Sequence, residues 1–458
     1  MIIAGIFFVS AIFVTILATP LVIRWSATGH GLDQPDAFRK RHRAPIPRLG
    51  GLPLFVVFIT GFILITNLQP SSSPGWAAIG ICSGLIFILG LWDDFKPLGA
   101  KAKLAGQILI ALTAHFMGLG INVITWPLGH FSMELGEWSL PLTVFWLVAI
   151  PNLVNLIDGI DGLASGVGLF LFITLGFVGW VGGQFGVTWI SFGMAGALLG
   201  FLCFNFPPAR IFLGDGGAYL IGFVIASLSL ASSNKGTIAA ALLVTTVALG
   251  LPIMDTTFAL LRRAVRGFPL FQADAEHIHH RLTLLGLSDR RVVLGMYLIS
   301  VVLSLVGLSV LWTQGRSLPV AGGLVFVLAI FAVRYLGYIW TWAELTTQIR
   351  RALSRRTDVK YTLLLAQLLE MEVGRCRNRA EFDAIFLQML VRAGFSLHGS
   401  GEMEGRSPIL LETRNSPPLT LYVPSEQQDN RYWKRMANCF RHAYQKAGER
   451  WDPEQIPK

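Results

Sequence analysis

Residues 152–189 read NLVNLIDGIDGLASGVGLFLFITLGFVGWVGGQFGVTW, and this stretch decides the fold class. Its second part, residues 163–189, carries no charge over more than the roughly 20 apolar residues that a helix needs to cross a bilayer. Its first part places Asp158 and Asp161 at the boundary of that apolar run. Ionised groups inside a membrane are costly unless they are paired, metal-bound or hydrated, so carboxylates at this boundary indicate a chemical role.

The rest of the chain repeats this apolar character. Of its 458 residues, 53% are hydrophobic and only 14% are charged, which is too apolar for a soluble protein of this size. Further charge-free windows cover residues 2–23 and 237–254. Such windows and the loops between them predict an all-α polytopic membrane protein with about eleven transmembrane helices. The first window has no basic n-region before it, which favours a retained helix over a cleaved signal peptide.

The positions of lysine and arginine predict the orientation. The basic loops contain Arg24, Arg39, Lys40, Arg41, Arg43 and Arg48 after the first window, and Arg262, Arg263, Arg266, Arg281, Arg290 and Arg291 before the last pair of windows. Because basic loops stay in the cytoplasm, the N-terminus is predicted to lie outside. Counting spans from there puts every carboxylate motif on the cytoplasmic face.

The character of the chain changes after about residue 342. The tail holds roughly half of all lysines and arginines, and no apolar run in it is long enough to span a bilayer. Residues predicted to be buried, at helical spacing, are Leu364, Leu368, Met371, Phe382, Ile385 and Met389. Residues 409–412 and 419–423 are predicted strands, and residues 430–450 a helix. We therefore expect a membrane domain of residues 1–341 and a small cytoplasmic α+β domain of residues 342–458 without a catalytic role.

Further carboxylates mark the ends of other apolar runs. Asp93 and Asp94 close one run, and Asp215 opens another within Gly214-Asp215-Gly216-Gly217. Adjacent side chains at a helix end point in different directions, so one aspartate can face a metal while the other positions a proton. Glycines around Asp215 allow the backbone to approach a phosphate closely.

Asn152, Asn155, Asp158 and Asp161 recur at intervals of three residues, so that neighbouring pairs share a helix face. Amides and carboxylates together can read the donors and acceptors of a nucleobase. Their oxygen atoms also suit Mg²⁺ or Mn²⁺ better than zinc.

Basic side chains complete the pattern. Lys103 and the first basic loop supply cations for a diphosphate, and His279, His280 and Arg281 add donors that can neutralise phosphoryl oxygens. Each motif alone has a simpler explanation, such as a solvated helix end, a polar turn, a surface loop or a topology signal. Their convergence on one face favours a metal-dependent active site.

Together the motifs resemble the polyprenyl-phosphate N-acetylhexosamine-1-phosphate transferases, most closely the bacterial branch that initiates O-antigen, teichoic acid and related glycans. The matching segments, in the family's order over residues 1 to about 340, are Asp33-Gln34-Pro35, Arg39-Lys40-Arg41-His42, Pro45-Ile46-Pro47-Arg48-Leu49-Gly50-Gly51, Asp93-Asp94, Lys103-Leu104-Ala105-Gly106-Gln107, residues 152–162, Phe212-Leu213-Gly214-Asp215-Gly216-Gly217 and His277-Ile278-His279-His280-Arg281-Leu282. The sequence departs from the family at Ala218, where a serine is common.

The resemblance implies transfer of N-acetylhexosamine 1-phosphate, with N-acetylglucosamine as the first choice of sugar, from a UDP-sugar to undecaprenyl phosphate. UMP would be released, and Mg²⁺ would be required, with Mn²⁺ as a substitute. The enzyme would be a multi-pass protein of the bacterial cytoplasmic membrane that contacts membrane lipid and no nucleic acid. A homodimer, direct attack against a covalent intermediate, and the glycan pathway are left open.

Residue roles also follow from the resemblance. Asp215 would be the principal metal ligand with Asn155 assisting, and the catalytic residues would be Asp93, Asp94, His279 and His280. Asp93 would accept or orient the lipid phosphate, and Asp94 would support it or the metal. The substrate-binding residues would be Arg39, Lys40, His42, Arg48, Lys103, Asn152, Asp158, Asp161, His277 and Arg281, with Asp161 facing uracil.

Other functions remain as alternatives. The phospho-N-acetylmuramoyl-pentapeptide transferases of peptidoglycan synthesis typically show Pro-x-His-His-His, whereas this chain has Glu276-His277-Ile278-His279-His280. An ion-coupled transporter would be expected to hold its carboxylates in broken helices near the middle of the bilayer. A CDP-alcohol phosphotransferase is remote, because the segment after Asp161-Gly162 lacks the arginine of that signature.

Overall fold

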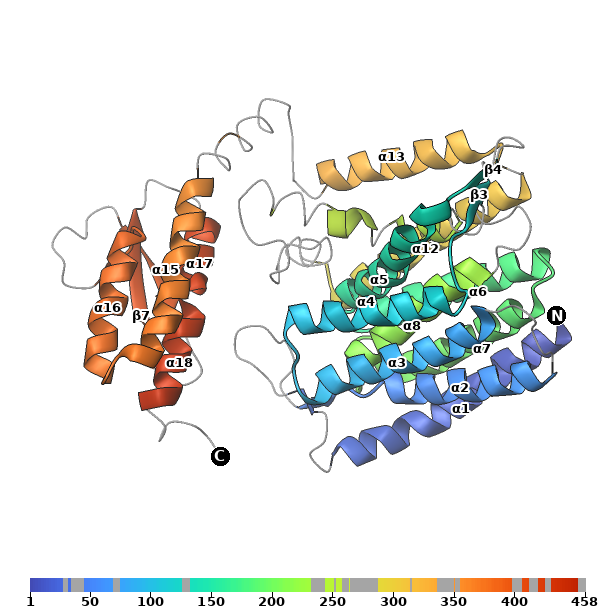
Figure 1. Cartoon of the computed structure of the whole chain (residues 1–458), viewed down its shortest axis with the longest axis horizontal. Coiled ribbons are helices and arrows are strands. Elements are labelled where there is room, and N and C mark those ends of the chain that lie inside the picture. Colours follow the sequence, from blue (N-terminus) through green and yellow to red (C-terminus); the bar gives the residue numbers. More distant parts are fainter. Residues whose placement is uncertain are drawn as a thin grey trace. The chain divides into compact units, whose positions relative to one another are not determined.

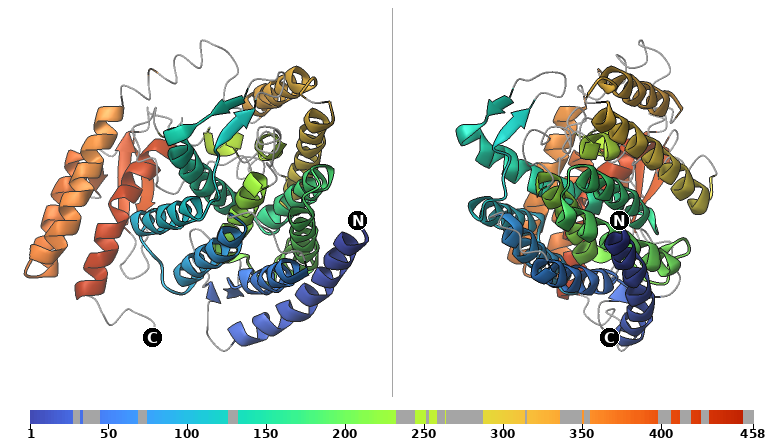
Figure 2. Two further views of the ribbon diagram at one scale, coloured as in Figure 1. Left: turned by 45° about the vertical axis from the view of Figure 1, so that its right-hand side comes forward. Right: turned by 90° about the vertical axis from the view of Figure 1, so that its right-hand side faces the viewer.

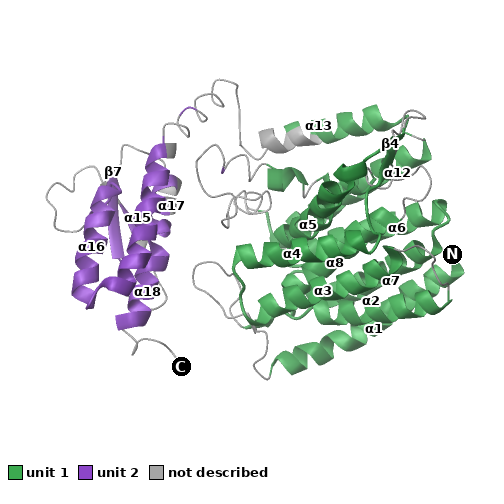
Figure 3. Ribbon diagram, in the orientation of Figure 1, with its two compact units in different colours: residues 1–259, 274–338 green, residues 260–273, 339–458 purple. Residues whose placement is uncertain are grey.

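The computed structural model of the chain describes residues 1–27, 32–33, 45–68, 75–125, 132–231, 244–250, 253–257, 263, 287–313, 315–335, 350, 355–397, 406–411, 419–424 and 430–451. The chain forms two compact units, residues 1–259 with 274–338 and residues 260–273 with 339–458 (Figure 3). The domain boundary predicted at residue 342 falls outside the described residues.

The first unit consists of long helices joined by short segments (Figure 1). Its helices are α1 (Ile2–Ser26), α2 (Gly51–Leu68), α3 (Gly75–Phe95), α4 (Ala100–Phe116), η1 (Gly136–Trp138), α5 (Ser139–Ile157), α6 (Leu163–Val181), α7 (Phe185–Asn205), α8 (Gly214–Ala231), α12 (Asp289–Trp312) and α13 (Leu318–Tyr335). Two antiparallel strand pairs lie in the loops, β1 (Leu32–Asp33) with β2 (Ile46–Pro47), and β3 (Val123–Thr125) with β4 (Ser132–Glu134).

Eight helical segments among the described residues are long and apolar enough to cross a membrane: α1, α2, α3, Gly136–Ile157, α6, α7, α8 and α12. An α-helix pairs its own backbone polar groups, which a bilayer requires of any segment that spans it. The chain is therefore a polytopic helical membrane protein, as its composition predicts. The predicted total of eleven also counts α4, α13 and residues 237–254, of which the last lie partly outside the described residues.

Helix α8 occupies the centre of this unit. In its apolar window 89% of the residues are buried, against 17% for α1, and it packs chiefly against α3, α5 and α2. Figure 2 shows it enclosed by these helices. Glycines permit the close contacts, because a β-carbon on Gly222 would overlap the backbone of Pro151 in α5. Since α8 begins with Gly214 and Asp215, its position places that motif where several helix ends meet.

Helices α1 and α7 are held close by two glycines one turn apart. A β-carbon on Gly196 would overlap the carbonyl oxygen of Phe8, and one on Gly200 would lie 2.8 Å from the carbonyl oxygen of Ile12. This small-xxx-small spacing lets two membrane helices pack backbone against backbone, where dispersion rather than the hydrophobic effect stabilises the pair.

The second unit combines helices and a sheet. Its helices are α15 (Arg356–Arg375), α16 (Arg379–Arg392), α17 (Asn430–Cys439) and α18 (Arg441–Trp451), and its antiparallel sheet has the order β5 (Ser396–Leu397), β7 (Leu419–Pro424), β6 (Arg406–Leu411). The predicted strands at 409–412 and 419–423 correspond to β6 and β7. The helix predicted over residues 430–450 is instead two helices that meet at Phe440.

The prediction of buried positions in α15 was wrong. Leu364, Leu368 and Met371 are 59%, 44% and 57% exposed, whereas Leu365 and Leu369 face the core at 4% and 0%. Helix α15 carries two apolar sets offset by one residue, and periodicity alone does not decide which set packs. In α16 the prediction was right for Phe382, which is fully buried, while Ile385 and Met389 are half-buried.

We expect Gly196→Leu to destabilise the first unit, because the new side chain must push α1 away from α7. The cost should lie at or above the upper end of the ~1–3 kcal/mol that overpacking typically produces. The measurement is the thermal unfolding midpoint in detergent. Gly322→Leu is the matched control, since a β-carbon at Gly322 in α13 meets nothing within 4 Å. Equal midpoints for the two variants would contradict the close α1–α7 contact.

Candidate active site

Backbone hydrogen bonds join the segment that enters α2 to the segment that enters α8. Gly50 N donates to the carbonyl of Phe212 and Gly51 N to that of Leu213, each at 2.9 Å, and Phe212 N donates to the carbonyl of Pro47 at 2.8 Å. A β-carbon on Gly51 would lie 2.5 Å from Gly217 N. Glycine at positions 51 and 217 is therefore needed for this close backbone contact.

The carboxylate of Asp94, near the end of α3, caps the start of α8. Its Oδ1 accepts from Asp215 N and its Oδ2 from Gly216 N, both at 2.9 Å. The first N–H groups of a helix have no partner within the helix, and an anion there is further favoured by the helix dipole. Gly214 makes the preceding turn at φ +77°, a conformation that favours glycine.

Lys103 bridges two carboxylates from different helices. Its Nζ lies 3.0 Å from Oδ2 of Asp93 and 3.0 Å from Oδ2 of Asp215. The turn between α3 and α4 makes this possible, because Leu98 N donates to Oδ1 of Asp93 at 2.6 Å and α4 starts two residues later. The side chains of Lys103 and Asp215 remain 23% exposed, and that of Asp93 13%, so a ligand can reach them.

The end of α5 contributes an amide and a second carboxylate. Asn155 Nδ2 donates to Oδ1 of Asp215 at 3.1 Å. Burial raises the pKa of Asp158 well above its ordinary value, and the charges of Asp215 and Asp94 raise it further, while Arg48 opposes the shift. Negative charge is therefore crowded here, which favours binding of an additional cation.

Asn152 lies one turn before Asn155 and has a different partner. Its Nδ2 donates to Oε1 of Gln107 at 2.6 Å and to the carbonyl of Val148 at 2.7 Å. Gln107 is 1% exposed and lies one turn after Lys103 in α4. The sequence interpretation assigned Gln107 no role, although its spacing of four residues from Lys103 places both on one helix face. As placed, Asn152 links α5 to α4.

Asp161 belongs to a separate network around the loop between α7 and α8. Its Oδ2 accepts from Ala209 N at 2.9 Å. Arg290 Nε donates to the carbonyl of Pro207 at 2.8 Å, and Tyr297 Oη donates to the carbonyl of Gly162 at 2.5 Å. Arg290 of α12 thus contacts the loop that leads to Asp215, and Tyr297 contacts the turn that follows Asp161. The sequence interpretation counted Arg290 only as part of a basic loop and assigned Tyr297 no role.

Several predicted site residues lie outside the described residues: Arg39, Lys40, His42, His277, His279, His280 and Arg281. Among the predicted residues that are described, the structure brings together Asp93, Asp94, Lys103, Asn155 and Asp215, with Asp158 and Arg48 near enough to interact electrostatically. In the described part of the chain, no three His, Cys, Asp or Glu side chains are grouped as a ready metal site.

Comparison with known proteins gives relatives that match most of the length of the chain. The family described as glycosyl transferase family 4 matches residues 76–233, which contain α3 to α8 and hence the cluster around Asp215. A Bacillus subtilis protein named as a probable undecaprenyl-phosphate N-acetylglucosaminyl 1-phosphate transferase is 35% identical over 324 residues, or 71% of this chain and 88% of the relative. A decaprenyl-phosphate N-acetylglucosaminephosphotransferase of Mycolicibacterium smegmatis is 35% identical over 61% of this chain and 74% of its own length.

A third relative, the undecaprenyl-phosphate alpha-N-acetylglucosaminyl 1-phosphate transferase of Escherichia coli, is 28% identical over 71% of this chain and 88% of its own length. These matches confirm the family that the motifs predicted. The chain covers most of the Bacillus subtilis relative and is 35% identical to it. The chain therefore belongs to glycosyl transferase family 4, and within this family it is similar to the polyprenyl-phosphate N-acetylglucosamine-1-phosphate transferases.

Proposed function

We propose that the chain transfers N-acetylglucosamine 1-phosphate from UDP-N-acetylglucosamine to undecaprenyl phosphate and releases UMP, as the first membrane step of a cell-surface glycan. The observation that carries the proposal is the meeting of Asp93, Lys103, Asn155 and Asp215 within the segment that matches the family. The pentapeptide transferase alternative is not favoured, because the relatives reported above are named for N-acetylglucosamine. Membership of a transferase family likewise disfavours the transporter.

The reaction forms one bond and breaks one. A phosphate oxygen of the lipid bonds to the phosphorus that carries the sugar, and the bond from that phosphorus to the bridging diphosphate oxygen breaks, so that UMP leaves. Asp93 would accept or orient the lipid phosphate from its partly exposed position beside Lys103. The Lys103 ammonium group would donate to diphosphate oxygens, where fixed positive charge stabilises the charge that develops.

The residues fit a Mg²⁺ or Mn²⁺ ion shared with the substrate. The Lys103 ammonium group lies 3.0 Å from the carboxylates of both Asp93 and Asp215. These two carboxylates therefore already stabilise one positive charge between them. Mg²⁺ is commonly bound by one or two carboxylates together with substrate phosphates and water, so a third acidic ligand is not required. Asn155 would add its amide oxygen after its amide group turns, because Nδ2 faces Asp215 here. When bound, the ion would neutralise diphosphate charge.

We further propose that the chain crosses the bacterial cytoplasmic membrane eleven times, with the N-terminus outside and the site and second unit in the cytoplasm. Besides the eight candidate spans, α4 and α13 and the partly described residues 237–254 supply the remaining spans. The basic loops around the site motifs support this orientation. The homodimer stays a prediction.

The proposal predicts UMP release that depends on both lipid and metal. Protein in detergent should release UMP from UDP-N-acetylglucosamine only when undecaprenyl phosphate is present. Excess chelator should abolish release, and added Mg²⁺ or Mn²⁺ should restore it, because oxygen ligands dominate the site. UDP-N-acetylgalactosamine and UDP-N-acetylmuramoyl-pentapeptide serve as comparison donors. Full activity in chelator would remove the metal assignment, and preference for the pentapeptide donor would overturn the proposed substrate.

Asp215→Asn and Asp161→Asn should affect different kinetic constants. Asp215→Asn keeps an acceptor for Asn155 but removes the charge, so turnover should fall about a hundredfold or more. Asp161→Asn can still accept from Ala209 N, so the loop should persist while UDP-sugar affinity weakens, with a smaller effect on turnover. Turnover, UDP-sugar affinity and Mg²⁺ dependence of the purified variants provide the comparison. Near-normal turnover of Asp215→Asn at ordinary Mg²⁺ would contradict its role.

Asp94→Asn tests whether Asp94 is a positioning residue. Both of its oxygens accept backbone N–H groups, and the amide nitrogen of asparagine cannot replace one of them. Loss of a helix cap typically costs ~1 kcal/mol, and the displaced Asp215 should lower turnover by about tenfold. The Mg²⁺ concentration for half-maximal activity should rise as well, whereas Asp161→Asn should leave it unchanged. A variant with lower turnover but unaltered Mg²⁺ dependence would argue against positioning of Asp215.

A further inference from the structure

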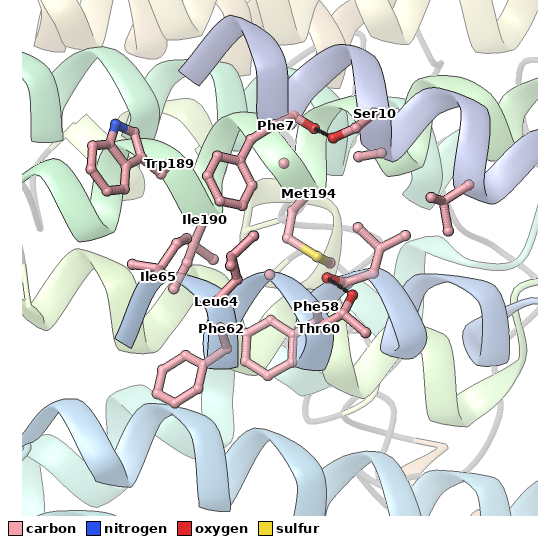
Figure 4. Close-up of a pocket in the computed structure, with 15 residues that line it drawn as sticks. Phe7, Ser10, Phe58, Thr60, Phe62, Leu64, Ile65, Trp189, Ile190 and Met194 are labelled. Atoms are coloured by element: carbon pink, nitrogen blue, oxygen red, sulfur yellow. Dashed lines mark hydrogen bonds between the residues drawn. The ribbon is translucent and has the colours of Figure 1, made fainter. Parts of the chain in front are cut away.

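A cavity of about 140 Å³ lies between α1, α2 and α7 (Figure 4). Its walls are mainly apolar, with rings from Phe7, Phe58, Phe62 and Trp189 and the side chain of Met194. None of the residues that contact the Lys103 cluster lines it. The cavity is therefore a feature of the membrane helices that the proposed reaction leaves unexplained.

Two glycines leave this volume open. A β-carbon on Gly61 would lie 3.9 Å from a ring carbon of Phe7, and one on Gly193 would lie 4.0 Å from the same side chain, which are ordinary contacts. Gly196 and Gly200, further along α7, instead meet the backbone of α1. Packing thus requires glycine at Gly196 and Gly200 but would accept a methyl group at Gly61 or Gly193. The cavity begins where the close α1–α7 contact ends.

The polar atoms of the lining are already hydrogen-bonded within their own helices. Ser10 Oγ donates to the carbonyl of Phe7 at 3.1 Å, and Thr60 Oγ1 donates to that of Val57 at 3.2 Å, as the dashed lines in Figure 4 show. Thr60 Oγ1 also donates to the carbonyl of Val56 at 2.6 Å. A water molecule needs two to four polar partners, and apolar cavities of about 150 Å³ stay dry and take apolar guests. Hydrocarbon is therefore the favoured occupant.

The cavity is continuous with the lipid-facing surface. In its lining, Val14 of α1 is 42% and Leu64 of α2 50% exposed, and both helices are candidate membrane spans. Hydrocarbon chains of the bilayer thus reach its opening. We propose that this cavity binds one acyl chain of a bilayer phospholipid, which fills the gap between α1 and the rest of the unit.

The position of α2 favours a phospholipid over the polyprenyl acceptor. Asp93, Lys103 and Asp215 belong to α3, α4 and α8, and α2 packs against α3, where the rings of Phe55 and Phe87 stack with centroids 4.3 Å apart and Phe62 of the cavity wall stacks on Trp76 at 5.4 Å. A polyprenyl chain whose phosphate lay at Asp93 would have to pass around α2 to enter the cavity. A phospholipid in the surrounding bilayer meets no such barrier.

Trp189 in the cavity wall provides the test. The full chain is reconstituted in vesicles of phosphatidylcholine in which a rising fraction carries an oleoyl chain brominated at its double bond, since bromine quenches nearby tryptophan. Subtracting the fluorescence of Trp189→Phe isolates the Trp189 signal from that of the other tryptophans. We expect saturable quenching at a low brominated fraction in the unaltered chain and in the control Gly322→Leu.

A side chain that fills the cavity should remove the saturable quenching of Trp189. In Gly61→Leu the brominated fraction for half-maximal quenching should rise by about tenfold or more, which corresponds to ~1.4 kcal/mol. Gly193→Ala adds one methyl group at an ordinary contact distance and should give a smaller rise, so a folded variant is available even if Gly61→Leu does not insert. UMP release and the thermal midpoint check that each variant is folded.

Two results would overturn the proposal. One is saturable quenching that is the same in the unaltered chain, Gly193→Ala and Gly61→Leu, which would place the bound lipid elsewhere on the surface. The other is a recovery of Trp189 fluorescence when undecaprenyl phosphate is added in an amount equimolar with the brominated lipid. This result would assign the cavity to the polyprenyl chain. Unchanged quenching in the presence of undecaprenyl phosphate supports the phospholipid.

Discussion

The hydrogen bonds that Asp94 accepts from the start of α8 are the contact on which the arrangement of the site depends. They tie the end of α3 to the first turn of the central helix, and they use the two N–H groups of Asp215 and Gly216 that a helix start leaves unpaired. With its backbone fixed, Asp215 presents its carboxylate between Lys103 of α4 and Asn155 of α5. One partly buried carboxylate thus orders side chains from four helices.

The sequence predicted which motifs belong to the site more completely than it predicted their contacts. The glycine and carboxylate motifs identified Asp93, Asp94 and Asp215, but the division of labour between adjacent Asp93 and Asp94 depends on the rotation of α3, which no local pattern encodes. Asn152 likewise follows the same spacing as Asn155, yet pairs with Gln107. Partners from distant helices decide such differences, because spacing within one helix specifies a face and not its neighbour.

Long charge-free runs predicted the spans well, since a bilayer excludes charge along the whole length of a helix. They did not distinguish α1, which faces lipid, from α8, which is enclosed by protein, because both environments are apolar. In the second unit the pattern did not show which of two apolar sides of a helix is buried. Helix α15 is apolar on two sides, and burial of Leu365 and Leu369 rather than Leu364 and Leu368 was decided by the core it meets.

The enclosed position of α8 also bears on how the protein is made. Its mean hydropathy of 1.4 is the lowest among the eight candidate spans in the described residues, because it contains glycine, serine and tyrosine. Such residues are acceptable in α8 because other helices, rather than lipid, surround it. Such a segment gains less than the others from entering bare hydrocarbon as it leaves the ribosome. Its main neighbours α2, α3 and α5 precede it in the chain and are in place to receive it. Asp215 consequently joins Asp93, Lys103 and Asn155 after the helices that carry them, so that this cluster is completed only when those helices have assembled.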